Sequence, residues 1–553
     1  MANYQIEDDA SDTESYSVKS DESDSISALD KLPVPETVSS FIPRALETQP
    51  AHFDPVQSLR RGKSKLKRNA SQKSAADPTL VTWDGPKDHS NPKNWPKSKK
   101  WTATLLVSCF TFISPVASTM VAPALGDIAD EYHITSSIEK ILVMSIFLLA
   151  YAVGPFLWGP LSEVFGRVRV LQAANIIYLL FNTVCGFAQT KQQMMAFRFL
   201  SGIGGSAPQA IGGGVLSDCF RAEDRGSAIA VYSLMPFIGP ALGPVAGGYI
   251  TQYTTWRWVF WSTSIFDAAV QVLALALLPE TYPAAILLKK AKELRKQTGN
   301  QELHTDREGP DHSMGKIMTK SLARPFIMLC TQPALQLMSL FRAYLYGLMY
   351  LVLATFPTVF QQSYDQSVSQ ASLNYLSLGV GFVGGLQVSG RLQDRTYAYC
   401  KRHQIDPCAS LFAKANWALP EYRLPLALPF SILVPIGLFI YGWSAQAQAH
   451  WFVPNMGACI FAFGLIICFN CAQAYVVDTY NTYAASATGA AAFVRTMAGF
   501  SFPLFAPKMY DSLGVGWGNS LLAFVSLGLG IVAPIAMWRW GIWLRSKSTY
   551  CVG

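Results

Sequence analysis

The chain has 553 residues, of which 50% are hydrophobic and only 14% are charged. This composition is too apolar and too sparsely charged for a large soluble enzyme, and it favours a polytopic membrane protein. The net charge of +8 lies in predicted loops and in the N-terminal region rather than in a basic surface with interleaved aromatic residues. We therefore expect no nucleic-acid partner.

The first hundred residues contain no apolar run long enough to build a core. An acidic, serine-rich part from Glu7 to Asp30 gives way to a basic cluster from Arg60 to Arg68, and we expect residues 1–100 to form a disordered cytosolic tail. The basic cluster either binds anionic membrane lipid or is a solvated segment that holds this end in the cytosol. Since the region is polar, we expect no cleavable signal peptide.

Twelve segments approach the roughly 20 apolar residues that a spanning helix needs. They form two groups of six, so we expect an all-α membrane protein with an N-terminal half at 101–279, a central cytosolic loop at 280–330, a C-terminal half at 331–541 and a cytosolic tail at 542–553. The predicted spans are 102–124, 138–158, 169–188, 193–216, 227–249, 259–279, 334–359, 372–390, 425–444, 451–475, 484–507 and 519–541.

Lysine and arginine are concentrated in every second predicted loop. Cytosolic loops carry more positive charge than the loops on the other side of a membrane, so this alternation predicts that both termini are cytosolic. The opposite loops hold few basic residues, chiefly Lys191, Arg257 and Lys508. We expect the plasma membrane as the location, because no vacuolar or reticulum signal is visible.

A short loop between the second and third spans carries a pattern of glycine, leucine and charge that recurs after the eighth span. Glycine lets two helix ends approach closely, and the charged side chains can pair or cap helix ends at the membrane surface. We expect each copy to close an apolar hairpin and to act as a conformational lock. The first copy contains Gly159, Leu161, Glu163, Gly166 and Arg167, and the second contains Gly390, Asp394 and Arg395.

Two further acidic residues occupy equivalent places, Asp218 after the fourth span and Asp478 after the tenth. Repeated halves with a site between them at mid-membrane are typical of alternating-access transporters. The first loop resembles the gating loop of the major facilitator superfamily, Gly-x-Leu-x-Asp-Arg-x-Gly-Arg-Arg, with Glu163 in place of the aspartate and Val164 and Val168 in place of basic residues. The resemblance implies twelve helices in two pseudo-symmetric six-helix halves.

The fifth span contains glycines four residues apart together with two prolines. Glycines at this spacing make a smooth stripe against a neighbouring helix, and prolines allow bending, so the segment is a packing and hinge device on physical grounds alone. The pattern Gly-x-x-x-Gly-Pro-x-x-Gly-Gly also looks like the antiporter motif of drug:proton exchangers, which implies export in exchange for protons. Its residues are Gly239, Gly243, Pro244, Gly247 and Gly248.

Other stretches between residues 91 and 545 resemble the fungal twelve-helix drug:proton antiporters. They are Asn91–Trp95, Trp256–Trp258, Pro279–Tyr282, Ser321–Pro325 and Phe502–Tyr510. The combination of Asp267 with Phe341–Gly347 looks like exporters associated with fungal secondary-metabolite clusters. These resemblances imply a small-molecule substrate, protons and membrane lipid as partners, and a monomer.

A charge inside a predicted span is costly unless it is paired or hydrated, and four charged residues within the spans are candidates for a functional role. They are Arg198, Asp267, Arg342 and Arg495. Arg198 resembles the superfamily's helix-4 arginine linked to proton transfer, although near a helix end it can also extend to the membrane surface. Asp267 and Arg342 either form a structural ion pair or take part in protonation and substrate binding. These alternatives conflict, because an ion pair with Arg342 would keep Asp267 ionised.

We expect a secondary active transporter that exports small hydrophobic or amphiphilic compounds by alternating access, driven by protons. Uptake of a nutrient or polyamine, and a non-transporting membrane sensor on the same fold, are the alternatives. We expect no enzyme activity, no cofactor and no metal. Cys468 and Cys471 form an isolated CxxC without a second pair, and the GxGxxG match at Gly379–Gly384 lies inside a predicted span rather than in a βαβ unit.

Overall fold

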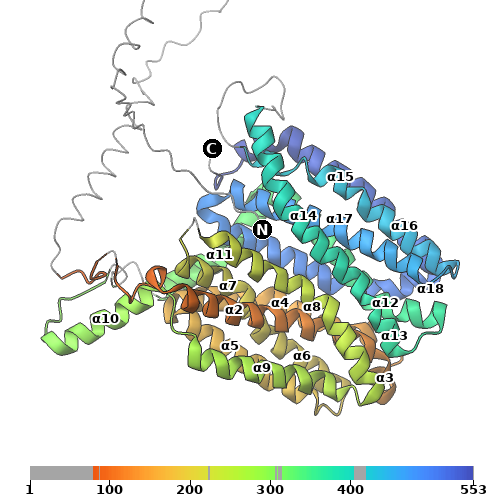
Figure 1. The fold of residues 1–553 in the computed structure, drawn as a ribbon, viewed down its shortest axis with the longest axis horizontal. Helices are drawn as coiled ribbons and strands as arrows, with labels where there is room; N and C mark the ends of the chain where they lie inside the picture. The colour runs from red at the N-terminus through yellow and green to blue at the C-terminus, as the bar shows by residue number, and fades with distance from the viewer. Residues whose placement is uncertain are drawn as a thin grey trace, which may run out of the picture. The chain divides into compact units, whose positions relative to one another are not determined.

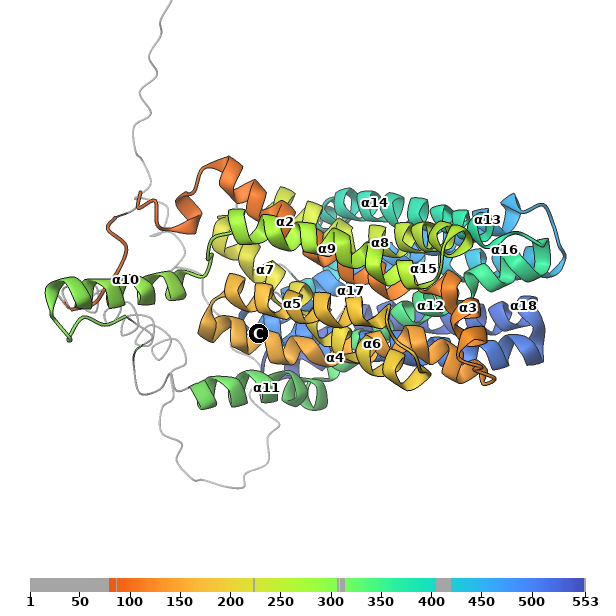
Figure 2. The ribbon, with the colours of Figure 1, turned by 90° about the horizontal axis from the view of Figure 1, so that it is seen from below.

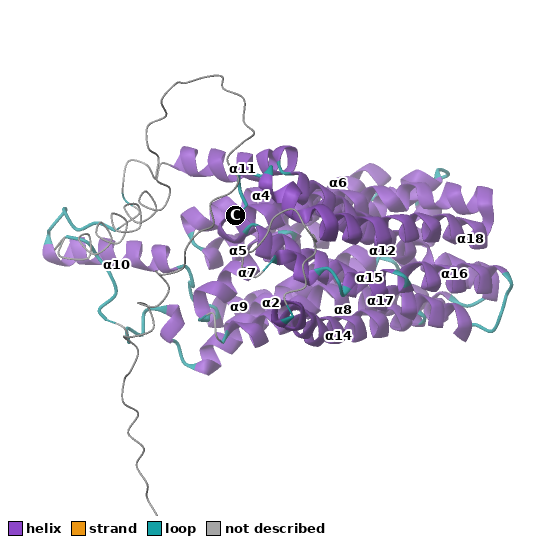
Figure 3. Cartoon of the chain, turned by 90° about the horizontal axis from the view of Figure 1, so that it is seen from above, coloured by secondary structure: helices purple, strands orange, loops and turns teal. Residues whose placement is uncertain are grey.

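The computed structural model describes residues 79–551 except 86, 222–223, 306–307, 309–313 and 404–418. Predictions for residues 1–78, including the basic cluster, lie outside the described residues. The described part is built from helices and loops, which Figure 3 colours by type.

The predicted disordered tail was too long, because residues 79–100 contain ordered structure. The side chain of Asn91 accepts a hydrogen bond of 3.0 Å from the backbone N–H of Lys93 and caps the short helix η1, Pro92–Asn94. Trp95 is buried, and the Val81 N–H donates to the carbonyl of His304 at 2.8 Å. An Asx cap, a proline and a buried tryptophan order this segment despite its polar composition.

The N-terminal half consists of helices that match the first six predicted spans. The fourth span is broken at Ser206 into two helices. The helices are α2 Lys97–Thr119, η2 Ala122–Ala124, α3 Leu125–Glu131, α4 Ser137–Phe165, α5 Arg167–Cys185, α6 Lys191–Gly205, α7 Ala207–Cys219, α8 Arg225–Tyr253 and α9 Arg257–Leu277.

The C-terminal half follows two helices of the central loop, α10 Pro283–Thr298 and α11 Met314–Thr331. Its last two predicted spans form one element, α18, which folds back at Gly514 (φ 74°, ψ 170°), a backbone conformation that favours glycine. The elements are α12 Pro333–Tyr364, α13 Val368–Leu373, α14 Tyr375–Arg402, η4 Pro420–Arg423, α15 Ala427–Ser431, α16 Leu433–Gln446, α17 Phe452–Thr479, η5 Asn481–Tyr483 and α18 Ala484–Ser546.

Among the described residues, nine helices are long and apolar enough to cross a membrane. One of them, α18, supplies two predicted spans, and the pair α6 and α7 and the helix α14 correspond to the remaining two. Large apolar side chains point outward, as expected for helices in lipid: Leu180, Ile265 and Val380 are 56%, 63% and 66% exposed. The prediction of an all-α polytopic membrane protein is confirmed.

Within residues 78–553 the two halves meet along several helix pairs. In the N-terminal half α2 packs on α8 and α9, and in the C-terminal half α12 packs on α18 and α14 on α17 (Figures 1 and 2). Between the halves, α4 contacts α18, and α8 contacts α13 and α14. A site between the halves is therefore bounded by α2, α4 and α8 on one side and by α12, α14, α17 and α18 on the other.

The central-loop helix α11 joins this contact toward the predicted cytosolic side. Phe326 of α11 has its ring 4.8 Å from that of Phe156 on α4 and 5.6 Å from that of Phe493 on α18. The rings of Phe156 and Phe493 are themselves 5.6 Å apart. Three aromatic rings from three helices thus pack together where α11 joins the two halves.

Candidate functional site

The first copy of the loop pattern is organised by a sharp backbone turn at Gly166. Helix α4 ends there with φ 100° and ψ 152°, and α5 begins at the next residue, Arg167. The carboxylate of Glu280 accepts hydrogen bonds from the backbone N–H groups of Arg167 and Val168 at 2.9 and 3.2 Å. A carboxylate at a helix N-terminus is stabilised by the helix dipole. A side chain at Gly166 would collide with this carboxylate.

The side chain of Arg167 connects the loop to the neighbouring helices. It donates to the hydroxyl of Ser162 at 2.7 Å, and its Nε lies 3.5 Å from Asp218 at the end of α7. Its guanidinium also lies over the ring of Tyr282, 4.8 Å from the centroid. The predicted residues Gly159, Leu161 and Glu163 lie in the last turns of α4. The structure therefore brings Arg167 and Asp218 together.

The second copy of the loop pattern does not form a loop, and this part of the prediction was wrong. Helix α14 runs through Gly390, Asp394 and Arg395 without interruption to Arg402. The reason lies seven residues after the first glycine of each copy. The first copy has Gly166 there, which adopts a positive φ, whereas the second has Tyr397, and no glycine or proline interrupts the helix before residue 402.

In the C-terminal half, Arg423 is the partner of the two acids that were predicted to act as locks, Asp394 and Asp478. Its guanidinium bonds Asp478 at 2.8 Å and Asp394 at 2.9 Å, and it lies 4.5 Å from the ring centroid of Tyr397. Burial opposes its charge, but the two carboxylates raise the pKa of Arg423 above its usual value. This residue was not predicted from the sequence, because it lies in the loop before the ninth span, away from the recurring pattern.

A second ionic contact in the C-terminal half was also missed. Glu421 is fully buried and bonds Arg545 through both oxygens, at 2.9 and 3.0 Å. The hydroxyl of Tyr475 donates to the same carboxylate at 3.4 Å. Glu421 and Glu280 both follow a proline, but acids next to proline also occur elsewhere in the chain, so the local sequence did not single them out.

The glycine stripe of α8 lies against α2 and against the other half. A side-chain carbon added at Gly239 would lie 2.8 Å from Pro115, and one added at Gly243 would lie 3.0 Å from the carbonyl of Val116. At Gly247 it would collide with the carbonyl of Met120, and at Gly248 with Ser372 of α13. Pro244 lies within α8, which remains helical around it. The packing role expected of the motif is therefore visible in the contacts.

Arg198 points into the N-terminal half and is fully buried, so it does not extend to the membrane surface. Its guanidinium donates to three backbone carbonyls, Ala117 at 3.0 Å and Val143 and Met144 at 3.3 Å. The ring of Phe147 lies 4.8 Å from it. Carbonyl groups of α2 and α4 thus accept hydrogen bonds from the buried guanidinium, and Arg198 of α6 connects these two helices to its own.

Asp267 is fully buried between α9 and α5. Its two oxygens accept hydrogen bonds from the Asn175 amide at 3.1 and 3.0 Å, and this amide also donates to Gln271 at 3.0 Å. Within the part of the chain that the structure describes, no basic side chain forms an ion pair with Asp267. The proposed pair with Arg342 therefore does not form, since Arg342 lies on α12 in the other half.

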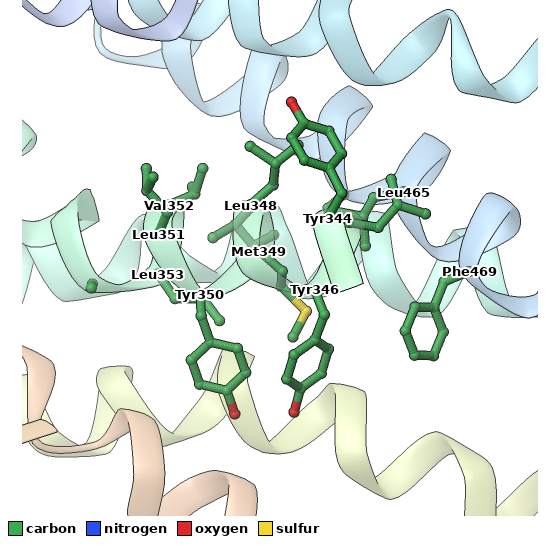
Figure 4. Packing of buried hydrophobic residues seen from close by; sticks show 14 of the residues in the cluster. Tyr344, Tyr346, Leu348, Met349, Tyr350, Leu351, Val352, Leu353, Leu465 and Phe469 are labelled. Carbon is green, nitrogen blue, oxygen red and sulfur yellow. The ribbon is translucent and has the colours of Figure 1, made fainter. Parts of the chain in front are cut away.

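Arg342 and Arg495 meet in the C-terminal half beside a cluster of aromatic rings. Their guanidinium carbons lie 4.5 and 5.5 Å from the ring centroid of Phe469, and that of Arg495 also lies 4.8 Å from that of Tyr346. Figure 4 shows Tyr346 and Tyr350 projecting from the same side of α12, opposite to Tyr344. The hydroxyl of Tyr350 lies 3.2 Å from that of Ser118 on α2, so this cluster reaches the other half.

Comparison with known proteins places these features in a family. The Major Facilitator Superfamily profile matches residues 107–503. The efflux pump vrtL of Penicillium aethiopicum is 50% identical over 478 residues, covering 86% of this chain and 92% of the relative. The transporter penM of Penicillium rubens is 39% identical over 487 residues, covering 88% and 93%.

Solved structures agree on the fold. A D-xylose-proton symporter superposes with a TM-score of 0.56 at 15% identity, covering 79% of this chain and 97% of the symporter. At this identity the likeness concerns the fold alone. The family match over most of the chain and the similarity to fungal transporters along nearly their whole length lead to one conclusion: the chain belongs to the Major Facilitator Superfamily.

Proposed function

We propose that this transporter exports small hydrophobic or amphiphilic compounds in exchange for protons, by alternating access of a site between its two halves. The environment of Asp267 is the observation that supports coupling to protons. This residue has a fully buried carboxyl group whose hydrogen-bond donor is a neutral amide, and no described basic side chain pairs with it. A carboxyl in such surroundings is able to gain and lose a proton.

The direction of transport is supported by the relatives and by the glycine stripe. The relative vrtL is named an efflux pump, and the antiporter-like motif packs α8 against both α2 and α13. Close contact of this kind holds the two halves together while the site is closed on one side. One proton moving through 100 mV supplies about 2.3 kcal/mol, which supports a substrate gradient of some tens-fold.

Uptake of a polyamine is the less favoured alternative. A polycation needs carboxylates around it, whereas the centre of the C-terminal half presents Arg342 and Arg495 beside aromatic rings. We further propose that the protein acts as a monomer in the plasma membrane with both termini in the cytosol, as its loop charges predict.

Sealed inside-out vesicles test the proposal. With an acidic interior, we expect uptake of a neutral lipophilic fluorescent dye that a protonophore abolishes and that withdrawal of ATP leaves unchanged. Gly247→Ala should reduce this uptake, because the added carbon collides with the carbonyl of Met120. Gly226→Ala is the matched control on the same helix, since a carbon there meets nothing within 4 Å. Folded protein that moves none of a broad dye panel would contradict transport and favour the sensor alternative.

A further inference from the structure

Two arginines inside the C-terminal half, the buried Arg342 and the half-buried Arg495, have guanidinium nitrogens that lack an acceptor. Nε and Nη1 of Arg342 and Nε of Arg495 are buried without a hydrogen-bond partner. By contrast, Arg198 donates to three carbonyls and Arg545 to a carboxylate. Arg342 is only 3% exposed. A buried guanidinium with unused donors is costly to the fold, and this cost suggests that a ligand supplies the missing acceptors.

We propose that Arg342 and Arg495 bind the negatively charged group of the exported molecule, so that the preferred substrates are aromatic anions such as carboxylates. This inference rests on the proposed transport function and names its substrate class. An arginine fork matches the two oxygens of a carboxylate, and charged hydrogen bonds are stronger than neutral ones. Two cationic groups beside one ring, that of Phe469, reinforce each other's attraction for an anion.

The neighbouring side chains fit the apolar part of such a molecule. The rings of Tyr346 and Phe469 lie 6.2 Å apart and are inclined by 28°, and that of Phe237 on α8 lies 6.0 Å from Phe469. These rings come from both halves, so a ligand held between the halves would meet aromatic side chains there. One turn beyond Phe469, the side-chain oxygen of Gln473 is buried without a partner and is able to accept a bond from a ligand hydroxyl.

No described carboxylate competes for these arginines. Asp267 is held by Asn175 in the other half, and the acids of the cytosolic end pair with Arg167, Arg423 and Arg545. The site is therefore cationic, and an anion entering it would neutralise charge. A cationic ligand of the same shape would be repelled.

A binding experiment separates this inference from transport. The protein is reconstituted in lipid nanodiscs without a proton gradient, and scintillation-proximity binding of radiolabelled naphthoate is measured against unlabelled naphthoate, naphthamide and naphthylmethylammonium, with empty nanodiscs as the blank. These ligands share the ring system and differ in charge. We expect naphthoate to bind at least about tenfold more tightly than naphthamide, since one charged hydrogen bond gained corresponds to about this factor.

Variants assign the preference to the arginines. Arg342→Gln and Arg495→Gln should each remove most of the preference for naphthoate while changing the naphthamide affinity less than about threefold, because the amide uses the rings alone. Arg342→Lys keeps the charge and should keep part of the preference, which provides a folded variant if the glutamine form is unstable. Arg295→Gln, which removes an arginine of the central loop paired with Glu308, is the control.

Each outcome decides the inference. Equal affinity for naphthoate and naphthamide, or a preference that survives in both glutamine variants, would overturn it. Acetate competing as well as naphthoate would also overturn it, because the site would then hold small anions without using the rings. If the dye uptake of the vesicle experiment is normal while naphthoate shows no preference, export stands and the substrate class is wrong. Naphthoate preference without any proton-driven uptake would instead contradict the export function.

Discussion

At the predicted cytosolic side, the ends of the two halves fasten their helices in different ways. In the N-terminal half, a glycine turn at Gly166 lets the carboxylate of Glu280 cap the first turn of α5. In the C-terminal half, α14 runs straight through the corresponding place, and Arg423 bridges Asp394 and Asp478 instead. The contact in the N-terminal half therefore depends on a backbone conformation, and the contact in the C-terminal half depends on ion pairs between side chains. We refer to the two as predicted locks.

Each half nevertheless keeps an arginine opposite the acid that follows its fourth helix. Arg167 lies 3.5 Å from Asp218, and Arg423 lies 2.8 Å from Asp478. What changes is the element that carries the arginine, the start of α5 in one half and the end of η4 in the other. The contact between the two charges is present in both halves, although the loop around it differs. A sequence pattern is thus a weaker guide to a lock than the position of its acid.

The halves also differ inside the membrane. The N-terminal half contains a buried acid, Asp267, and an arginine, Arg198, that donates to three carbonyls. The C-terminal half contains Arg342 and Arg495, which have N–H groups without acceptors. Under the proposed function, the proton site and the substrate site lie in different halves. Coupling then acts through the relative motion of the halves and not through direct contact between the two charges.

The largest expected effect separates these two sites. Asp267→Asn keeps the shape of the side chain but cannot release a proton, so proton-driven uptake into inside-out vesicles should fall by about a hundredfold. Exchange of labelled for unlabelled substrate across the membrane, without a proton gradient, should continue. Full proton-driven uptake by Asp267→Asn would refute the assignment. Loss of both uptake and exchange would make Asp267 a structural partner of Asn175.

The next effect compares the buried Glu421 with the half-buried Glu280, the two acids at the predicted cytosolic ends of the halves. Glu421→Gln leaves Arg545 without its counter-charge and should cost about 3 kcal/mol of stability. Glu280→Gln retains an oxygen for the N–H groups of α5 and should cost about 1 kcal/mol. Thermal unfolding of the purified protein measures both. The double variant of Glu421→Gln with Arg545→Met should recover part of the loss, and equal losses at Glu421 and Glu280 would contradict the distinction between the two locks.

A third pair of substitutions exchanges the residues that make the turns differ. Gly166→Ala forces a side chain into a backbone conformation that favours glycine and against Glu280, so it should cost about 1–3 kcal/mol. Tyr397→Gly places a glycine in the helix of the other half and should cost about 1 kcal/mol without breaking α14. Circular dichroism and thermal unfolding report both changes. A Gly166→Ala variant as stable as the parent would show that the turn does not depend on glycine.

Much of the fold was visible in the sequence because a lipid environment requires long apolar segments. The break between α6 and α7 and the fold-back at Gly514 were not visible in the sequence. The first occurs among small residues, and the second depends on the φ angle of a single residue. The candidate residues were found because charges are rare in apolar runs. Their partners were not, because Asn175, Glu280, Glu421 and Arg423 are ordinary in the local sequence and acquire importance through contacts distant along the chain.

The smallest expected effect tests whether the C-terminal lock needs both of its acids. The side chain of Asp394 is 80% exposed, whereas that of Asp478 is 34% exposed. Solvent and salt weaken an exposed ion pair, so Asp394→Asn should cost less than about 1 kcal/mol and should leave uptake nearly unchanged. Asp478→Asn should cost more and should slow transport, because it separates α17 from Arg423. If both variants lose the same stability at low and at high salt, Asp394 is as important as Asp478. The predicted locks of the two halves would then be more alike than their backbones.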